Sequence, residues 1–249
     1  MAIALIQARM GSSRLPGKTL MPLWQGHSVL EVLLTRLRRC RRLDGLVVAT
    51  STQDDDTAIE ALCRALAVPC FRGDATDVLG RLAAASREYP ACYYVRVCAD
   101  NPLMAAEPLE ALVDFCVARD LDFAHNNRAG SGLVDGFGAE VLSAGALRRL
   151  AQEASTPEER EHVTLHIMAH PERYRSGQLA ADPDLRRPQY RLDVDYHEDL
   201  EFLRELCRRL SHERGPLWSA LEIVSVLDAD PDILALRRAR PTTVASLGT

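Results

Sequence analysis

The chain has 249 residues, of which 47% are hydrophobic and 26% are charged, as in a globular protein that buries a substantial core. Its formal net charge of −5 argues against a general nucleic-acid or membrane-surface binder. No window reaches the roughly 18 apolar residues of a membrane span, and the apolar start lacks the charged region of a signal peptide. We therefore expect a cytoplasmic protein that binds neither nucleic acid nor membrane.

The cysteines indicate the same compartment. They are odd in number, show no C-x-x-C spacing and mostly lie inside apolar runs. The seven are Cys40, Cys63, Cys70, Cys92, Cys98, Cys116 and Cys207. This pattern predicts reduced, buried thiols rather than a disulfide framework or a zinc site.

Strand-like and helical patterns alternate in the first half of the chain. Short apolar runs predict strands, and amphipathic patterns predict helices between them. The strands are expected over 2–8, 45–50, 68–71 and 91–100, and the helices over 27–40, 51–67, 76–89 and 108–120. This alternation predicts an α/β fold with a mostly parallel sheet covered by helices on both faces, a three-layer, Rossmann-like arrangement.

The pattern changes after residue 125, where a glycine-rich stretch begins. The segments that follow have the patterns of a strand and a helix over 139–154, a helix over 157–170, a late strand over 191–195 and a helix over 196–210. There is no internal repeat and no linker. We therefore expect a single domain over 1–249, with an inserted subregion at about 126–190.

The segment GSSRLPGKTL at residues 11–20 ends like a phosphate-binding P-loop but does not fit one. Five residues separate Gly11 from Gly17, where a P-loop has four. Pro22 would break the helix that the Lys-Thr pair of a P-loop opens, and Pro16 removes a backbone N–H from the loop. The sequence therefore excludes a P-loop at this position.

The same loop still has the composition of an anion site. It follows the first strand, where ligands of α/β sheets bind, and it carries Arg9, Arg14 and Lys18 beside the hydroxyl groups of Ser12 and Ser13. A triphosphate needs several such donors. A basic surface loop explains these residues equally well on their content alone.

The stretch QARMGSSRLPGKTL resembles the N-terminal signature of the sugar cytidylyltransferases, the CMP-ketodeoxyoctulosonate and CMP-sialic acid synthetases. It is most similar to the branch named for spore-coat polysaccharide biosynthesis protein F. Further blocks of that branch follow in the same order: LDGLVVATSTQDDDTAI, FRGDATDVLGR, VRVCADNPLM, VDGFGAEVLSAGAL, EREHVT and YRLDVDYHEDLEFL.

The resemblance implies a fold of the nucleotide-diphospho-sugar transferase type and a Mg²⁺-dependent reaction. Such an enzyme joins CMP from CTP to an acidic sugar and releases pyrophosphate, in surface polysaccharide or glycoconjugate biosynthesis. The resemblance also implies a homodimer, with the 126–190 subregion binding the acceptor or forming the dimer contact.

For the nucleotide, the resemblance implies that Lys18, with Arg9 and Arg14, stabilises the charge that builds on the phosphoryl oxygens. The nucleotide-binding residues would be Ala8, Arg9, Gly11, Ser12, Ser13, Lys18, Arg72, Asp77 and Arg81. Asp77 and Arg81 are four positions apart on a predicted helix, so a plain surface ion pair is an alternative for them.

For the metal, the resemblance implies Asp100 and Asp195 as Mg²⁺ ligands, each at the end of a predicted strand. Without the resemblance, an aspartate that caps the next turn would be the preferred interpretation of each. Asp193 is an alternative ligand. Ala99 and Asn101 depart from the residues that are usual in this block.

For the acceptor, the resemblance implies Arg96, Asp135, Glu140, Glu161 and His162. Arg96 lies on an otherwise apolar strand, so it should face a polar cleft or an acidic partner. Histidines also recur every four residues, at His162, His166 and His170, which predicts one stripe on a helix. We interpret them as structural or substrate-contacting rather than as a zinc site, because the glutamate of H-E-x-x-H is missing.

Other functions compatible with the sequence differ in substrate or in chemistry. A glycosyltransferase of the related fold would use a D-x-D motif, which occurs at Asp193–Asp195 and also at 54–56 and 228–230. The triplet at Asp193–Asp195 lies late in the chain, after the inserted subregion, which disfavours this alternative. A cytidylyltransferase could instead act on a phosphonate or a phosphorylated alcohol. A non-catalytic nucleotide-binding protein of the same fold is disfavoured by the presence of a set of four residues: Arg9, Lys18, Asp100 and Asp195.

Overall fold

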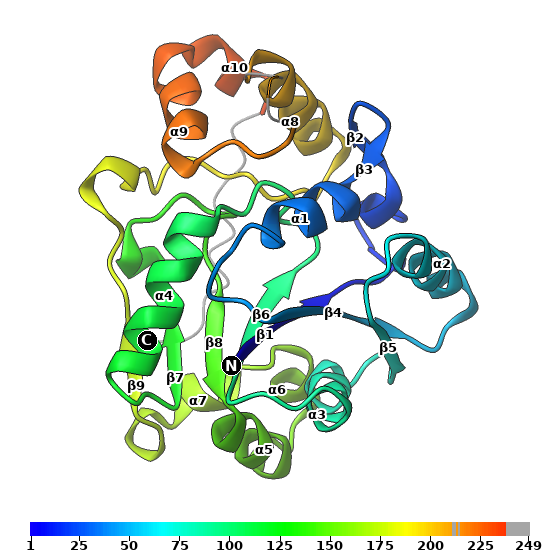
Figure 1. Ribbon diagram of the computed structural model, residues 1–249, viewed down its shortest axis with the longest axis vertical. Coiled ribbons are helices and arrows are strands. Elements are labelled where there is room, and N and C mark those ends of the chain that lie inside the picture. Colours follow the sequence, from blue (N-terminus) through cyan, green and yellow to red (C-terminus); the bar gives the residue numbers. More distant parts are fainter. Residues whose placement is uncertain (211–212, 214, 238–249) are drawn as a thin grey trace.

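A central sheet organises the computed structural model, which describes residues 1–210, 213 and 215–237 (Figure 1). Within that part of the chain, seven strands pair in the order β5–β4–β1–β6–β8–β7–β9. In chain order they are β1 (Ala2–Gln7), β4 (Gly45–Ser51), β5 (Cys70–Gly73), β6 (Tyr93–Cys98), β7 (Phe123–His125), β8 (Glu140–Ser143) and β9 (Ser176–Gln178). β8 pairs antiparallel with β6 and β7, and the other described pairs of this seven-stranded sheet are parallel. The prediction of a mostly parallel sheet is confirmed.

Helices cover both faces of the sheet, which confirms the three-layer α/β prediction. On one face lie α1 (Val29–Leu37), α2 (Thr57–Ala65) and α4 (Ala106–Ala118); on the other lie α3 (Val78–Glu88) and α5 (Ala144–Glu153). Successive residues of a strand point to opposite faces. Ala4 and Ile6 of β1 therefore join the first core, and Leu5 joins the second.

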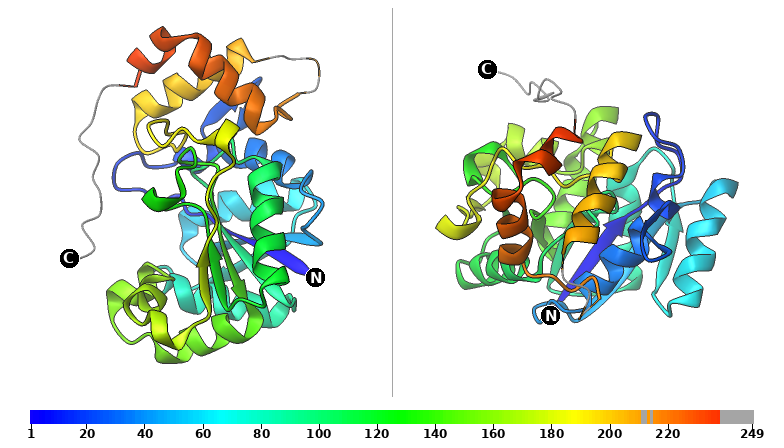
Figure 2. Two further views of the ribbon diagram at one scale, coloured as in Figure 1. Left: turned by 90° about the vertical axis from the view of Figure 1, so that its left-hand side faces the viewer. Right: turned by 90° about the horizontal axis from the view of Figure 1, so that it is seen from above.

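A third hydrophobic cluster forms a cap at one end of the sheet (Figure 2). It contains α8 (His197–Arg209), α9 (Ala220–Ala229), α10 (Pro231–Ala235) and the small hairpin of β2 (Pro22–Trp24) and β3 (His27–Ser28). The cap also includes buried Leu103 and Val194, which are close in sequence to the two predicted metal ligands. It therefore brings distant segments to one edge of the sheet.

Arg36 of α1 fastens the cap to the rest of the molecule. Its buried guanidinium donates hydrogen bonds to four backbone carbonyls: those of Leu103 (3.1 Å), Met104 (2.9 Å), Pro216 (2.6 Å) and Trp218 (2.9 Å). Burial lowers the pKa of Arg36 to about 10, so the guanidinium remains charged at neutral pH.

Two predicted elements differ from the structure. The strand expected over 191–195 is wrong: this segment makes an isolated bridge at Arg191 and then hydrogen-bonds to two different loops. The single helix expected over 157–170 is also wrong. It divides into α6 (Pro157–Glu161) and α7 (Leu165–Ala169), because the chain turns at His162 to bury Val163 and Thr164.

The predicted subregion 126–190 contributes β8 and β9 to the central sheet and supplies α5, α6 and α7. Its boundaries, and the single domain over 1–249, stay predictions; residues 238–249 lie outside the described part. None of the described helices has both the length and the apolarity to cross a membrane. All seven cysteines are free thiols.

Short 3₁₀ helices connect several of these elements. They are η1 (Lys18–Leu20), η2 (Asp54–Asp56), η3 (Ala129–Ser131), η4 (Pro171–Arg173) and η5 (Pro183–Leu185). η1 and η2 follow β1 and β4, at the carboxyl ends of these strands, where the predicted nucleotide-binding residues lie.

Candidate active site

The loop after β1 folds back on itself. The carbonyl of Met10 accepts hydrogen bonds from the backbone N–H groups of Ser12 and Gly17, both at 2.9 Å. Gly17 has φ of +76°, a left-handed conformation that favours glycine, and it turns the chain into η1 at Lys18. Of the other residues predicted here, Gly11 and Ser13 are exposed on the loop and Ala8 is buried at its start.

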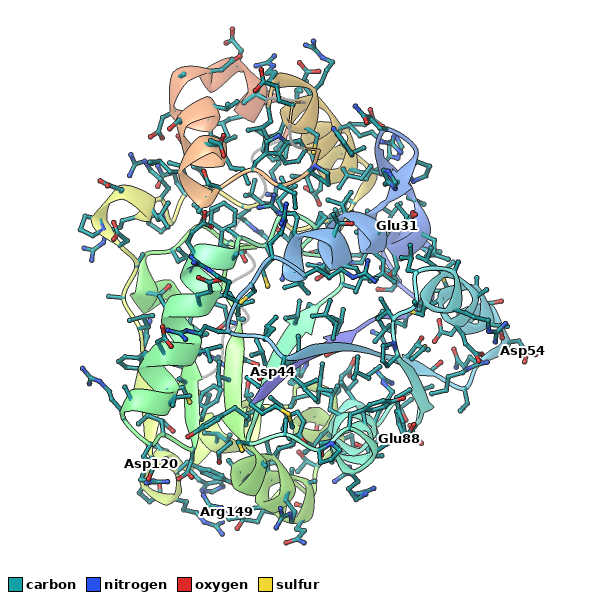
Figure 3. The ribbon with its side chains drawn as sticks, viewed as in Figure 1. Glu31, Asp44, Asp54, Glu88, Asp120 and Arg149 are labelled. Atoms are coloured by element: carbon teal, nitrogen blue, oxygen red, sulfur yellow. The ribbon has the colours of Figure 1, made fainter. Side chains whose placement is uncertain are left out.

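Two side chains hold this loop in place. The Thr19 hydroxyl donates to the carbonyl of Arg9 at 3.0 Å, and the Met10 N–H donates to Oδ1 of Asp56 at 2.6 Å. Sequence reasoning missed Asp56 as a site residue, because the acidic triplet 54–56 is typical of a helix start. Asp56 is buried, whereas Asp54 lies at the outer rim of the molecule (Figure 3).

Lys18 lies at the centre of the site. Its Nζ donates to Oδ2 of Asp100 at 2.8 Å, to the carbonyl of Val194 at 2.6 Å and to Oδ1 of Asp195 at 3.2 Å. The Val194 N–H donates to the Asp100 carbonyl at 2.8 Å and so joins the two acidic segments. Burial alone would lower the pKa of Lys18, but Asp100 and Asp195 outweigh it and raise the pKa above its ordinary value.

Asp195 has a second cationic partner. Nη2 of Arg14 donates to Oδ1 of Asp195 at 2.8 Å, and the guanidinium lies 5.4 Å from the ring centre of Tyr196. Asp199, at the start of α8, accepts from the backbone N–H groups of Asp195 (3.0 Å) and Tyr196 (2.9 Å) and fixes the turn. Lys18, Arg14, Asp100 and Asp195 therefore form one cluster.

Asp193, the alternative metal ligand, has different partners. Its two oxygens accept from Arg191 and Arg237, each at 2.8 Å. The two ends of the D-x-D motif thus face different cations, because Asp195 faces Lys18. This arrangement does not support a shared role for Asp193 and Asp195 as a D-x-D metal motif.

Arg81 is almost completely buried, with 1% of its surface exposed. Its Nη1 donates to the carbonyl of Asp74, but Nε and Nη2 have no hydrogen-bond partner among the described residues. Burial lowers the pKa of Arg81, and the charge of Arg9 lowers it further. A buried guanidinium with unused donors beside a second arginine favours an anionic ligand at this position.

The remaining nucleotide predictions are engaged in protein contacts. Arg72 donates to the carbonyls of Ser51 (3.0 Å) and Gln53 (2.7 Å) and pairs with Glu60 at 3.0 Å. Asp77 caps α3 by accepting from Gly80 N–H at 2.7 Å. Its ion pair is with Arg160, at 2.5 Å, and not with Arg81 four positions along the helix as the surface alternative required.

Arg96 pairs with the buried Glu140, which it faces in the β6–β8 register. Nη1 of Arg96 donates to Oε2 of Glu140 at 2.7 Å, and its Nη2 donates to Gln7 at 3.1 Å. Oε1 of Glu140 accepts from Thr164 (2.8 Å) and Arg128 (3.2 Å), two residues that sequence reasoning missed. Burial alone would raise the pKa of Glu140, but Arg96 and Arg128 outweigh it and lower the pKa.

The other acceptor predictions lie nearer the surface. Asp135 pairs with Arg191 at 3.2 Å, and Glu161 lies 3.8 Å from Arg9. His162 is exposed where α6 ends. The structure thus brings Arg96 and Glu140 into one network and leaves these three residues outside it.

The predicted histidine stripe is wrong, because the helix breaks at His162. His166 is buried and hydrogen-bonds through Nδ1 to Oε1 of Glu159 at 2.7 Å. His170 packs beside it, with ring centres 4.6 Å apart. Glu159, His166 and His170 are close enough to share a metal ion. The Glu159 carboxylate also caps α6, which accounts for its position without a metal.

Comparisons with known proteins give a consistent result. A family model described as "Cytidylyltransferase" matches residues 3–222. The chain is 34% identical over 240 residues to spore coat polysaccharide biosynthesis protein SpsF of Bacillus subtilis, covering 94% of this chain and 97% of that protein. The structure of a cytidylyltransferase from Leptospira borgpetersenii superposes with a TM-score of 0.87 at 27% identity, covering 96% of this chain and 98% of that one. CMP:2-keto-3-deoxy-manno-octonic acid synthetase, solved with CTP, has a similar fold, with a TM-score of 0.62 at 20% identity over 84% of this chain and 98% of that one.

Proposed function

Because this chain belongs to the cytidylyltransferase family, we propose that it transfers CMP from CTP to an acidic sugar, with Mg²⁺, and releases pyrophosphate. An acceptor oxygen attacks the α-phosphorus, the bond to the pyrophosphate oxygen breaks, and the acceptor hydroxyl proton is released. The name of the B. subtilis relative supports a role in surface polysaccharide biosynthesis.

The convergence of Lys18, Arg14, Asp100 and Asp195 is the observation that carries this proposal. Phosphoryl transfer depends chiefly on positioning and on charge stabilisation, so it needs fixed cations next to a metal site. The four side chains come from three segments that are distant in the sequence. A shared phosphate and metal centre accounts for their meeting.

The donor atoms fit a divalent cation of the Mg²⁺ type. Two carboxylates and the carbonyl of Val194 already surround one positive charge, the Lys18 ammonium. Hard oxygen donors are those that Mg²⁺ takes. We assign Asp100 and Asp195 as its ligands. When bound, Mg²⁺ would neutralise phosphate charge, while Lys18 and Arg14 bind the phosphoryl oxygens.

The unpartnered donors of Arg81 support a nucleotide beside the β1 loop. Arg9 lies nearby and is about half exposed, so it is free to turn toward phosphates. We assign the phosphates to this loop and to Lys18. Arg72 and Asp77 act indirectly, by fixing the β4–α2 connection and the start of α3.

We assign the acceptor to the side of the site formed by Arg96, Glu140 and Arg128. An acidic sugar carries a carboxylate, and an arginine fork binds carboxylates well. Asp135, Glu161 and His162 remain candidates for contacts from the surface. A phosphonate or a phosphorylated alcohol would bind to the same cations, so both must be tested as acceptors beside the sugar acids.

The test is pyrophosphate release from CTP in the presence of a panel of sugar acids, phosphonates and sugar phosphates, with the other three triphosphates as controls. We expect release to require CTP, a sugar acid and Mg²⁺. Asp100→Asn should lower kcat by about 100-fold or more, with an unchanged circular dichroism spectrum. Consumption of a nucleotide sugar without pyrophosphate release would overturn the proposal.

We also propose a cytoplasmic homodimer, as the resemblance of the sequence implied. The 126–190 segment is the proposed contact. Light scattering at working concentration tests this: a mass of about twice 27.6 kDa is expected, and a single chain at all concentrations would contradict it.

A further inference from the structure

Lys18 sits in a cage of oxygen atoms that suits a small cation. Its ammonium is within 3.2 Å of two carboxylates and one carbonyl, and its side chain is only 11% exposed. An ammonium is a compact point charge, whereas a guanidinium is a wide planar fork. The Lys18 ammonium therefore stands between Asp100 and Asp195 much as a metal ion would.

The composition of the chain singles out this residue. The sequence has 30 lysines and arginines, and Lys18 is its only lysine. The other 29 of these 30 residues are arginines. Since Arg14 already supplies a guanidinium to Asp195, the use of a lysine at position 18 indicates that the small size of the cation matters there.

The charges of the cluster balance without a metal. Lys18 and Arg14 neutralise Asp100 and Asp195, so a divalent cation entering alone would add an excess of positive charge at close range. A cation that enters with a triphosphate brings more negative than positive charge. Lys18 and Arg14 then have phosphate oxygens to move to, and both carboxylates become available.

We propose that the Lys18 ammonium occupies the divalent-cation position in the nucleotide-free protein, so that the cation binds tightly only together with the triphosphate, to which Lys18 moves. This inference rests on the proposed assignment of Asp100 and Asp195 as metal ligands. In this proposal the Lys18 ammonium has two successive positions. It lies between Asp100 and Asp195 before the nucleotide binds, and it contacts the phosphates afterwards.

The position of Lys18 between the two acids is tested by measuring Mn²⁺ binding in the absence of nucleotide, with electron paramagnetic resonance as the readout. Lys18→Met should bind Mn²⁺ about tenfold or more tightly than the unmodified protein, because the competing charge is gone. Lys18→Met combined with Asp100→Asn should lose that gain. Arg87→Met, which removes one charge from the exposed surface of α3, should leave the affinity unchanged. Equal Mn²⁺ affinity in Lys18→Met and the unmodified protein would overturn the proposal.

The unmodified protein offers a second test that needs no variant. Lysine labelled with ¹³C at Cε gives a single lysine resonance, because the sequence contains one lysine. Mg²⁺ alone should leave this resonance in place, and Mg²⁺ with CTP should shift it. A shift with Mg²⁺ alone as large as that with Mg²⁺ and CTP would contradict the proposal.

These results separate the inference from the proposed function. Pyrophosphate release from CTP combined with equal Mn²⁺ affinities would leave the function standing and remove the inference. Tighter Mn²⁺ binding by Lys18→Met, together with no turnover of CTP by the unmodified protein, would support the inference and remove the function.

Discussion

Asp54 and Asp56 stand two positions apart in one acidic triplet and have opposite environments. Asp54 is exposed at the rim of the molecule (Figure 3), whereas Asp56 is buried and accepts hydrogen bonds from Met10 and Ser51. Asp56 thereby ties the loop after β1 to the loop after β4. It is a positioning residue for the proposed phosphate site.

The two acids make a matched pair of variants. Asp56→Asn should raise KM for CTP several-fold and lower the unfolding free energy by about 1–2 kcal/mol, because one buried N–H loses its carboxylate partner. Asp54→Asn should change neither quantity. Steady-state kinetics and urea unfolding measure both effects. Equal KM values in the two variants would show that Asp56 has no positioning role.

The convergence of the main charged residues of the site could be predicted from the sequence. Two of the residues that contact Glu140 could not. Lys18 and Asp100 converge, since the loop after the first strand and the segment after β6 lie at the same end of the α/β sheet. Asp195 reaches them although its predicted strand does not form, because the Val194 N–H donates to the Asp100 carbonyl. Thr164 and Arg128 could not be predicted. The contact of Thr164 with Glu140 depends on the break after α6, which no local pattern predicts, and Arg128 reaches Glu140 from the loop after β7.

The break between α6 and α7 is the clearest departure from local helical pattern. Glu159 holds it from one side: its carboxylate accepts from the N–H groups of Ser155 (2.9 Å) and Thr156 (3.0 Å) and pairs with His166. The Thr156 and His166 hydrogen bonds lower the pKa of Glu159 to about 2. One side chain thus caps one helix and anchors the next.

The lowered pKa predicts a pH dependence of stability. Because the pKa of Glu159 is lower in the folded protein than in the unfolded chain, its contribution is fully present above about pH 4.5 and is lost as the pH falls toward 2. The Tm should therefore fall over that range, and Glu159→Gln should flatten the fall. Melting curves at several pH values measure this. Glu158→Gln, on the exposed side of α6, is the control, and an equal flattening in that variant would contradict the assignment.

At the scale of the whole molecule, the cap is a separate layer that rests on the end of the sheet. Arg36 connects the cap to α1, because its guanidinium donates to carbonyls of the segment after β6 and of the chain before α9. The same segment carries Asp100 only three residues before Leu103. The stability of the cap and the position of Asp100 are therefore linked.

Removal of this fastening should destabilise the fold. Arg36→Met would leave four buried carbonyls without their donor, and we expect a loss of about 3 kcal/mol or more in unfolding free energy. Arg39→Met, just beyond α1 on the exposed surface, should cost less than about 0.5 kcal/mol. Denaturant unfolding compares them. Equal losses in the two variants would mean that the carbonyls find other partners.

The sheet and the helices on its two faces could be predicted from the sequence. The assembly of the cap could not. Alternating strands and helices are local patterns, and they specified the first half of the sheet correctly. The cap draws on β2, β3, residues 133–137 and three helices after residue 196, and no local pattern links these segments. The short strands β7 and β9 were not predicted either, because three residues are too few to show a strand periodicity.

The long sequence separations within the cluster of Lys18, Asp100 and Asp195 have a consequence for biosynthesis of the protein. Asp100 and Asp195 lie 82 and 177 residues from Lys18, so most of the chain must be synthesised before the third member of the cluster exists. Contacts between such distant segments form slowly, after the local ones. A ribosome-bound chain that ends before residue 190 would contain Lys18, Arg14 and Asp100 but not Asp195. The protein would acquire its proposed chemistry in a late step of folding.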